Sequence, residues 1–283
     1  MSDISRRALL GMGALGAVGI AGLAMEAKGA DGPNQGEESV QACCPIVELR
    51  QYTLHPGTRD AFTSLFEREF VDSQEALGIT VIGQFHDLDD PDRFVWLRGF
   101  ADMEMRRAGL TAFYDGELWR AHREAANASI LDSDNVLLLR EAAAGSGLAT
   151  ARLRRPSSAA NPPAGVVIAA IHYIDATLAD AFADFFDARM RPALARLGLP
   201  PIARFRTEGA ANNFPRLPVR TFDSVFVWLA AATNAGDSDR RLRAFRDGQA
   251  AWREGAGDPI LHQLARKPEL LRLVPTPRSA LRG

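Results

Sequence analysis

Polar side chains that could take part in binding or catalysis interrupt three segments of the chain that are otherwise apolar. Residues 46–54 read as a strand, and alternation along a strand places Arg50 and Tyr52 on one face. The same alternation places His86 on one face of a second strand, and it places Trp96 and Arg98 together on one face of a third. If these faces line a cavity, the two arginines and their neighbours are the groups that would orient a ligand there.

Each of these residues also has a purely structural interpretation. A buried arginine needs an anionic partner or several acceptors, and Arg50 could meet that need by pairing with Glu48. Tyr52 and His86 could serve as acid or base groups, or pack with a single hydrogen bond each. Trp119 follows a helix break at Asp115-Gly116 and either anchors the split helix or forms the lip of a pocket. The ligand-binding candidates are therefore Arg50, Tyr52, His86, Trp96, Arg98, Tyr114 and Trp119.

No catalytic or metal-binding motif is complete, so catalytic residues stay unknown and no metal or cofactor is expected. None of the five histidines lies four residues from another, which excludes a helical zinc pair. A single histidine could still ligate haem iron, a cofactor kept as the alternative. The acidic run 87–92 lacks the glycine and distal glutamate of a calcium loop and reads as a solvated turn.

Composition excludes several classes of protein. The chain has 283 residues, of which 47% are hydrophobic and 24% charged, which is typical of a folded protein. These values argue against a disordered chain and a protein with many membrane spans. The net charge of −2 provides no basic surface, so nucleic acid is not an expected partner.

The N-terminus has the pattern of an export signal. Arg6-Arg7 precede a weakly apolar run of small residues, and together they are similar to a twin-arginine signal peptide over residues 1–30. We therefore expect a periplasmic or secreted protein, with no stable membrane insertion after cleavage; the alternatives are an uncleaved anchor and a chance match to the signal pattern. Residues 31–45 read as a flexible lead-in that ends near the adjacent Cys43 and Cys44, whose role stays open.

An internal repeat organises the remainder of the chain. Asp60-Ala61-Phe62 recurs 120 residues later, and Phe94-Val95-Trp96-Leu97 recurs 132 residues later as Phe226-Val227-Trp228-Leu229. The change of offset predicts a 12-residue insertion in the second copy. The predicted parts are a first domain at 46–141, a linker at 142–165, a second and diverged domain at 166–276, and a tail at 277–283.

Each copy shows the element order β-α-β-β-α-β of ferredoxin-like folds. Helices then cover one face of each four-stranded sheet. The strands carry large apolar residues on both faces, so the second face must be buried as well. Two tandem copies achieve this when sheet packs on sheet, which predicts an α+β fold in the form of a pseudo-symmetric dimeric α+β barrel with a central cavity.

Several motifs of the first copy resemble the NIPSNAP family. These are Glu48-Leu49-Arg50-Gln51-Tyr52, Pro56-Gly57, the Phe94–Leu97 strand, Phe113-Tyr114 and Trp119. The resemblance implies a dimeric α+β barrel, akin to antibiotic-biosynthesis monooxygenases, but it implies no defined reaction. The second copy has Ala170-Ile171-His172-Tyr173 where the first has its polar strand.

Three functions compete at this point. The first is an exported protein that binds a small molecule in the barrel cavity. The second is a monooxygenase- or isomerase-like enzyme, for which haem is the cofactor to consider. The third is a non-catalytic interaction module, which a packed and dry barrel interior would favour. A homodimer is compatible with all three.

Overall fold

The computed structural model describes residues 42–156, 164–252 and 259–283. The predicted signal peptide, most of the lead-in and the centre of the predicted linker lie outside this part of the chain. Within it, no helix is long and apolar enough to cross a membrane.

The first repeat folds in the predicted order, with each helical region divided into shorter pieces. The elements are β1 (Ile46–Leu54), α1 (Arg59–Leu65), the π-helix η1 (Phe66–Phe70), α2 (Val71–Glu75), β2 (Thr80–Asp87), β3 (Arg93–Phe100), α3 (Met103–Tyr114), α4 (Glu117–Asn127) and β4 (Ile130–Glu141).

The second repeat follows a short 3₁₀ turn, η2 (Thr150–Arg152), and repeats the same order. Its elements are β5 (Val166–Tyr173), η3 (Ala176–Leu178), α5 (Ala179–Phe185), the π-helix η4 (Phe186–Met190), α6 (Arg191–Arg196), β6 (Ala203–Thr207), β7 (Val225–Ala232), α7 (Ala235–Trp252), α8 (Pro259–Ala265) and β8 (Glu269–Pro275).

Local sequence signals account for several of these boundaries. The Asp102 carboxylate accepts a hydrogen bond from the Met105 backbone N–H and so caps the start of α3. Gly78 ends the first helical region with a φ of 77°, a conformation that glycine adopts without strain. Strand β4 spans twelve residues and pairs with β1 along nearly its whole length.

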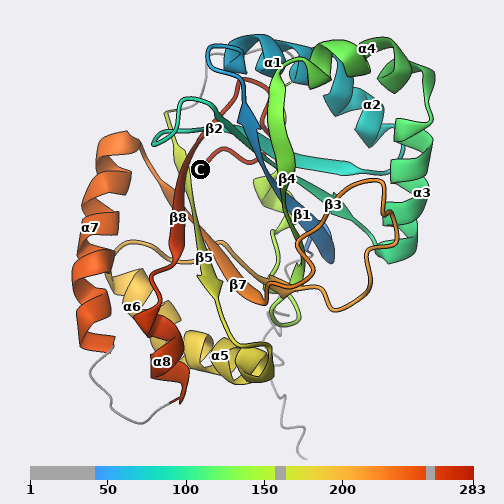
Figure 1. The fold of residues 1–283 in the computed structure, drawn as a ribbon. Helices are drawn as coiled ribbons and strands as arrows, with labels where there is room; N and C mark the ends of the chain where they lie inside the picture. Colours follow the sequence, from blue (N-terminus) through green and yellow to red (C-terminus); the bar gives the residue numbers. More distant parts are fainter. Residues whose placement is uncertain (1–41, 157–163, 253–258) are drawn as a thin grey trace, which may run out of the picture. The chain divides into compact units, whose positions relative to one another are not determined.

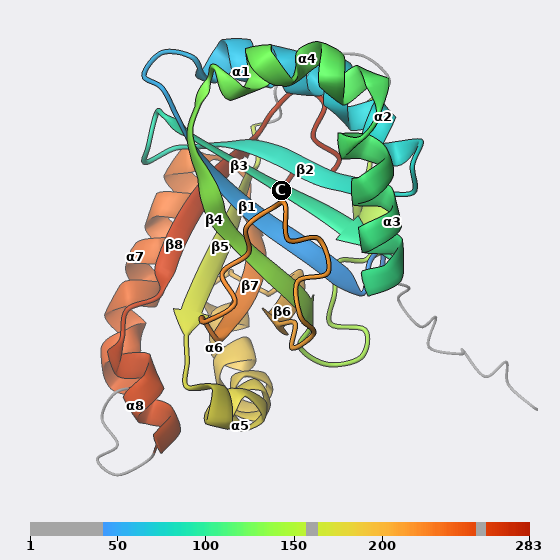
Figure 2. The same cartoon turned by 45° about the vertical axis from the view of Figure 1, so that its right-hand side comes forward.

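The eight strands close into one barrel in the order β1-β3-β2-β8-β5-β7-β6-β4. The two repeats meet at two seams, where β2 pairs with β8 and β4 pairs with β6. Helices of each repeat cover the outer face of their own strands, as Figures 1 and 2 show. The predicted α+β barrel is therefore confirmed.

The barrel interior is packed with apolar side chains from all eight strands. Every strand contributes at least one buried residue to a single cluster, which includes Val47, Leu49, Phe85, Val95, Leu97, Leu137, Leu139, Val167, Ala169, Ile171, Phe205, Val227, Leu229, Leu271 and Leu273. Cys44 also packs into this cluster and is only 1% exposed, while Cys43 is partly exposed; both are free thiols.

The predicted polar faces point away from this interior, so the expectation that they line a central barrel cavity is wrong. Along β1, Val47 and Leu49 face inward, and the intervening Glu48, Arg50 and Tyr52 therefore face the helices of the first repeat. Apolar side chains thus fill the barrel interior, and the charged groups lie in the layer between the sheet and the helices.

Candidate functional site

The site is built on the outer face of β1 and β3, under the helices of the first repeat. These strands are antiparallel, with Arg50 opposite Trp96 and Glu48 opposite Arg98. Cross-strand neighbours on one face have their Cβ atoms close together, so strand register alone brings these four side chains into contact.

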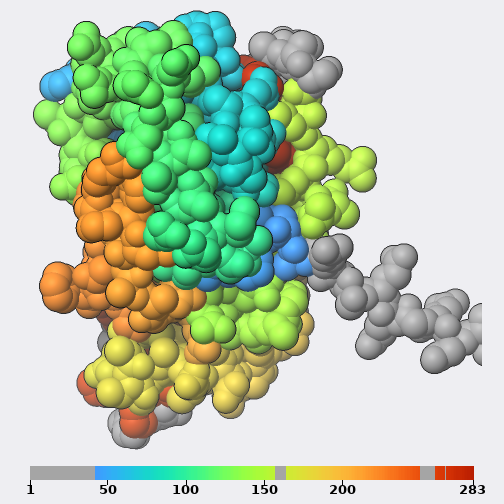
Figure 3. Space-filling view, turned by 90° about the vertical axis from the view of Figure 1, so that its right-hand side faces the viewer, coloured from blue at the N-terminus to red at the C-terminus, as the bar shows by residue number. Residues whose placement is uncertain are grey.

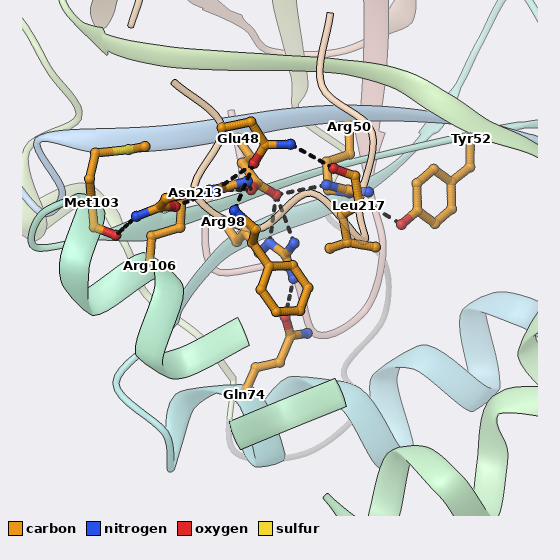
Figure 4. A network of polar contacts seen from close by, with 11 residues as sticks. Glu48, Arg50, Tyr52, Gln74, Arg98, Met103, Arg106, Asn213 and Leu217 are labelled. Atoms are coloured by element: carbon orange, nitrogen blue, oxygen red, sulfur yellow. Dashed lines mark hydrogen bonds and ion pairs between the residues drawn. The ribbon is translucent and has the colours of Figure 1, made fainter. Parts of the chain in front are cut away.

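Three arginines surround one carboxylate at the centre of the site (Figure 4). Glu48 lies 2.7 Å from Arg50 Nη1, 2.7 Å from Arg98 Nη2 and 2.7 Å from Arg106 Nη2. All four side chains are fully buried. Arginine stays protonated in proteins, so the cluster of Glu48, Arg50, Arg98 and Arg106 has two positive charges in excess when Glu48 is ionised. We call these four residues the arginine cluster.

The charge balance keeps Glu48 ionised. Burial alone would raise the pKa of Glu48, but Arg98, Arg50 and Arg106 outweigh burial and hold that pKa well below its usual range. The carboxylate therefore never takes up a proton near neutral pH and remains the counterion of all three arginines.

Neutral groups supply the remaining acceptors for the arginines. Arg50 Nε donates to the Tyr52 hydroxyl at 3.2 Å, and Arg98 Nη1 donates to Gln74 Oε1 at 3.1 Å. Arg106 Nη1 donates to two side-chain amides of the second repeat, Asn212 and Asn213. These bonds satisfy most of the N–H groups without removing the surplus charge.

An aromatic cavity adjoins the arginine cluster. It has a volume of about 30 Å³, enough for a water molecule. The Arg98 guanidinium lies 5.0 Å from the centre of the Trp96 ring, and the Arg50 guanidinium lies 5.6 Å from it, which is within the range of cation–π attraction. The lining residues are Tyr52, Phe62, Phe66, Phe70, Gln74, Trp96, Phe113, Tyr114, Trp119, Ala126 and Ile130.

Two buried hydrogen-bond donors at the site have no partner among the described residues. They are Trp96 Nε1, whose residue lines the cavity, and Arg50 Nη2, whose guanidinium packs on Trp96. Buried N–H groups are rarely left unpaired, because each one costs about 1–3 kcal/mol. Both donors are therefore free to bond an acceptor that the described residues do not supply.

The second repeat provides an internal comparison for this site. Strand pairing shows the correspondence, since Trp228 lies opposite Ala170 as Trp96 lies opposite Arg50. The repeat offsets then match the arginine cluster, in the order Glu48, Arg50, Arg98 and Arg106, with Ile168, Ala170, Ala230 and Ser238. All four of these counterparts are fully buried.

The tryptophan of the second repeat is also satisfied where that of the first is not. Trp228 Nε1 donates to His172 Nε2 at 3.1 Å, and His172 occupies the position that corresponds to Tyr52. Burial lowers the pKa of His172 to about 3, so the ring is neutral and its Nε2 can accept. The chain thus contains the same fold twice, once with the polar site in the first repeat and once without it in the second.

Six of the seven predicted site residues meet here. Arg50, Tyr52, Trp96 and Arg98 lie on the strands, and Tyr114 and Trp119 approach from α3 and α4, with their ring centres 4.9 Å apart. The predicted pairing of Arg50 with Glu48 is present as well.

His86 is the predicted residue that the structure does not bring to the cavity. Its Nε2 lies 2.8 Å from the Thr63 hydroxyl, and it is absent from the cavity lining. Burial, with the nearby Arg59, lowers the pKa of His86. Across the described ranges, no group of three His, Cys, Asp or Glu side chains is arranged to hold a metal ion.

Sequence analysis missed Gln74, Arg106, Asn212 and Asn213 as members of the site. Arg106 carried a usable signal, because it precedes Leu110 by four residues and Phe113 by seven on the buried stripe of α3. An arginine in such a stripe must find partners inside. Asn212 and Asn213 carried no comparable signal, since they lie in a connection of the other repeat.

Comparison with known proteins agrees with this architecture. Residues 47–143 match the NIPSNAP family. A Fusobacterium nucleatum protein, provisionally named a monooxygenase, is 7% identical with a TM-score of 0.50, over 82% of this chain and 93% of that one. At that identity the likeness shows a shared fold alone.

Two further solved structures are similar to parts of the chain. A second provisionally named monooxygenase, from Lactobacillus acidophilus, is 14% identical with a TM-score of 0.45, over 82% of this chain and 94% of that one. A NIPSNAP-like domain protein from Burkholderia xenovorans is 26% identical with a TM-score of 0.31, over 33% of this chain and 81% of that one. No curated protein matches the chain in sequence.

Proposed function

We propose that the first repeat binds a small organic anion in the cavity between its sheet and its helices, and that the second repeat is the structural half that closes the barrel. The observation that carries this proposal is the arginine cluster, which is fully buried and has two positive charges in excess, while the same place in the second repeat is filled by Ile168, Ala170, Ala230 and Ser238.

The fold itself does not require the buried charges. The second repeat builds the same strands and helices with apolar side chains and one serine at those positions. Removing three guanidinium groups and a carboxylate from water costs several kcal/mol per ion, and an apolar replacement is often neutral or stabilising. A cluster that is expensive and dispensable for folding is best explained by the ligand that it binds.

The surroundings favour an anion with an aromatic or apolar body. The unpaired N–H groups of Trp96 and Arg50 can each donate to a ligand oxygen, and the excess charge favours a negative one. The remaining walls are mostly aromatic rings. Pockets for organic ligands are usually about 300–1,000 Å³, so such a ligand must widen the cavity by moving side chains that now fill it.

Calorimetry with benzoate, and with neutral benzamide as its isostere, tests the proposal. We expect the full chain to bind benzoate and to bind benzamide at least about tenfold more weakly, because the interaction with charged donors is lost. Arg50→Met should weaken benzoate binding by a similar factor. Arg107→Met is the matched control, since Arg107 is exposed on α3 and pairs only with Glu104 among the described residues.

Native mass spectrometry of protein purified from its own host provides the complementary result. A co-purified organic anion that is lost from Arg50→Met would support the proposal directly. If the purified protein holds no small molecule and benzoate binds no better than benzamide, the anion-binding proposal fails. That result would favour the non-catalytic interaction module instead.

A second candidate function is catalysis in the same cavity. Its specific support is the Tyr52 hydroxyl, which lies at the cavity and accepts a hydrogen bond from Arg50 Nε at 3.2 Å. That hydrogen bond holds the hydroxyl in place at the cavity wall, where it could take part in proton transfer. Tyr52→Phe separates the two functions: turnover of a bound ligand should fall steeply, whereas ligand affinity should change little.

We also propose that the protein is exported by the twin-arginine route, on the strength of Arg6-Arg7 and the apolar run that follows. Changing Arg6-Arg7 to Lys-Lys should retain the protein in the cytoplasm of its host, as judged by immunoblots of cell fractions. Detection of that variant in the periplasm at wild-type levels would refute the proposed route.

A further inference from the structure

The predicted insertion of the second repeat is the connection between β6 and β7. It spans residues 208–224, seventeen residues, whereas the matching connection between β2 and β3 spans residues 88–92, only five. The difference equals the 12 residues expected from the change of repeat offset. Figure 1 shows this orange segment leaving its own sheet and running beside β3 and α3 of the first repeat, and Figure 3 shows it beside the green surface there.

The insertion is held against the first repeat by several kinds of contact. Phe214 is buried, and its ring centre lies 5.8 Å from that of Tyr114, a residue of the cavity wall. Leu217 and Val219 pack on the core beneath the helices of the first repeat. Arg216 forms an ion pair with Asp115 at 2.8 Å. These contacts place the second repeat directly behind Tyr114, which lines the cavity of the first repeat.

Two asparagines of the insertion reach the arginine cluster itself. Asn213 Oδ1 accepts from Arg106 Nη1 at 2.8 Å, and Asn212 Oδ1 accepts from the same nitrogen at 3.1 Å. Each amide also donates from its Nδ2, that of Asn213 to the Met103 carbonyl at 2.6 Å and that of Asn212 to the Leu217 carbonyl at 2.8 Å. The carbonyl partners determine which end of each amide faces Arg106. Figure 4 shows Asn213 between Met103 and the cluster.

We infer that Asn212 and Asn213 are positioning residues of the anion site: they fix Arg106, and through it Glu48, without adding a negative charge. This inference rests on the proposed function. A carboxylate could accept from Arg106, but it could not donate to the neighbouring carbonyl, and it would reduce the excess positive charge from two to one. The amides therefore hold the guanidinium in place and leave its charge for the ligand.

The surplus charge is screened only weakly because the site is buried, so a further charge there acts strongly on an anion in the cavity. The carboxylate of an aspartate at position 213 would lie beside Arg106 and would repel an anion in the cavity. An effect of charge at position 213 therefore ranks the benzoate affinities of the variants differently from an effect of packing.

Benzoate affinity of Asn213→Asp and Asn213→Ala distinguishes charge from packing. If the amide acts by staying neutral, Asn213→Asp should weaken benzoate binding by about tenfold or more, and Asn213→Ala, which keeps the charge surplus, should weaken it less. If the amide only packs, Asn213→Ala should bind as weakly as Asn213→Asp or more weakly. Benzamide, which has no charge, should respond equally to both substitutions.

A matched control exists in the same chain. Asn135 Oδ1 accepts from Arg220 Nη1 at 3.0 Å, and neither residue lines the cavity. Asn135→Asp therefore makes the same chemical change beside another guanidinium. This substitution should leave benzoate binding unchanged. Wild-type protein that binds benzoate, with Asn213→Asp binding it equally well, overturns the inference alone. Wild-type protein that shows no preference for benzoate over benzamide overturns the proposed function, and the inference with it.

Discussion

At the scale of single residues, Glu48 is the one anion that three buried guanidinium groups share. Its two oxygens contact Arg50, Arg98 and Arg106, each at 2.7 Å, and the low pKa of its carboxyl follows from these contacts. Breaking a buried ion pair from one side is far more costly than replacing both partners, because it leaves charge buried without compensation. Glu48 is consequently the residue of the cluster on which the stability of the first repeat most depends.

Glu48→Gln should lower the free energy of unfolding by about 3–5 kcal/mol, since three buried guanidinium groups would then have no counterion. Urea denaturation followed by circular dichroism measures the loss. Glu104→Gln is the control, because Glu104 is exposed, pairs with Arg107 on the surface of α3, and should cost little. Equal effects of the two substitutions would show that the cluster is compensated by groups other than Glu48.

His172 makes the stability of the second repeat depend on pH. Its pKa is about 3 in the folded state because of burial, against about 6.5 in an unfolded chain. Below pH 6.5 the unfolded chain binds a proton that the folded chain does not, so stability is full above that pH and falls as the pH approaches 3. Unfolding free energies measured in urea from pH 7 to 4 should show this decline.

His172→Gln should flatten that decline, because glutamine can still accept from Trp228 Nε1 and does not titrate. The comparison isolates His172 from Glu48, whose carboxyl would take up a proton only at much lower pH and also with a loss of stability. An unchanged pH profile in His172→Gln would mean that His172 does not control the acid sensitivity.

Six residues of the site could be predicted from the sequence, but the direction in which they face and several of their partners could not. Parity placed Arg50 with Tyr52 and Trp96 with Arg98 correctly, since that depends only on the period of a strand. Parity does not say which face is interior when both faces are buried, as in β1. Asn212 and Asn213 lie more than 100 residues from Arg106 in the sequence and contact it only in the folded chain. The residues around them in the sequence give no sign of this contact.

At the scale of elements, the insertion between β6 and β7 packs residues of the second repeat on the core beneath the helices of the first repeat. The sequence predicted the length of this segment but not where it lies. Its buried residue Phe214 contacts Tyr114, whereas Phe222, eight residues later, is fully exposed. The segment therefore contains both an anchoring aromatic residue and a free one, which allows a matched test.

Phe214→Ala should lower the free energy of unfolding by about 3 kcal/mol, because it removes a buried aromatic side chain and leaves a cavity beside Tyr114. Phe222→Ala in the same segment should change it by less than about 0.5 kcal/mol. Thermal or urea unfolding measures both. If the two substitutions have the same small effect, the insertion does not pack on the first repeat in solution.

At the scale of the whole chain, the two seams of the barrel are related by the pseudo-symmetry of the repeats. Phe85 of β2 lies opposite Pro275 of β8 at one seam, and its counterpart Phe205 of β6 lies opposite Glu141 of β4 at the other. Each seam therefore joins the second strand of one repeat to the last strand of the other. The interior cluster likewise draws buried residues from both repeats.

This symmetry predicts how the first repeat behaves alone. A fragment of residues 42–156 would expose the apolar inner face of its sheet and the unpaired edges of β2 and β4, surfaces that favour association. Because each native seam joins equivalent strands, two fragments can pair β2 of one with β4 of the other at both seams and close a barrel with two-fold symmetry. Light scattering during size-exclusion chromatography should then give twice the fragment mass. A folded, monomeric fragment at micromolar concentration would contradict the prediction, and it would mean that the first repeat does not need a second sheet to cover its inner face.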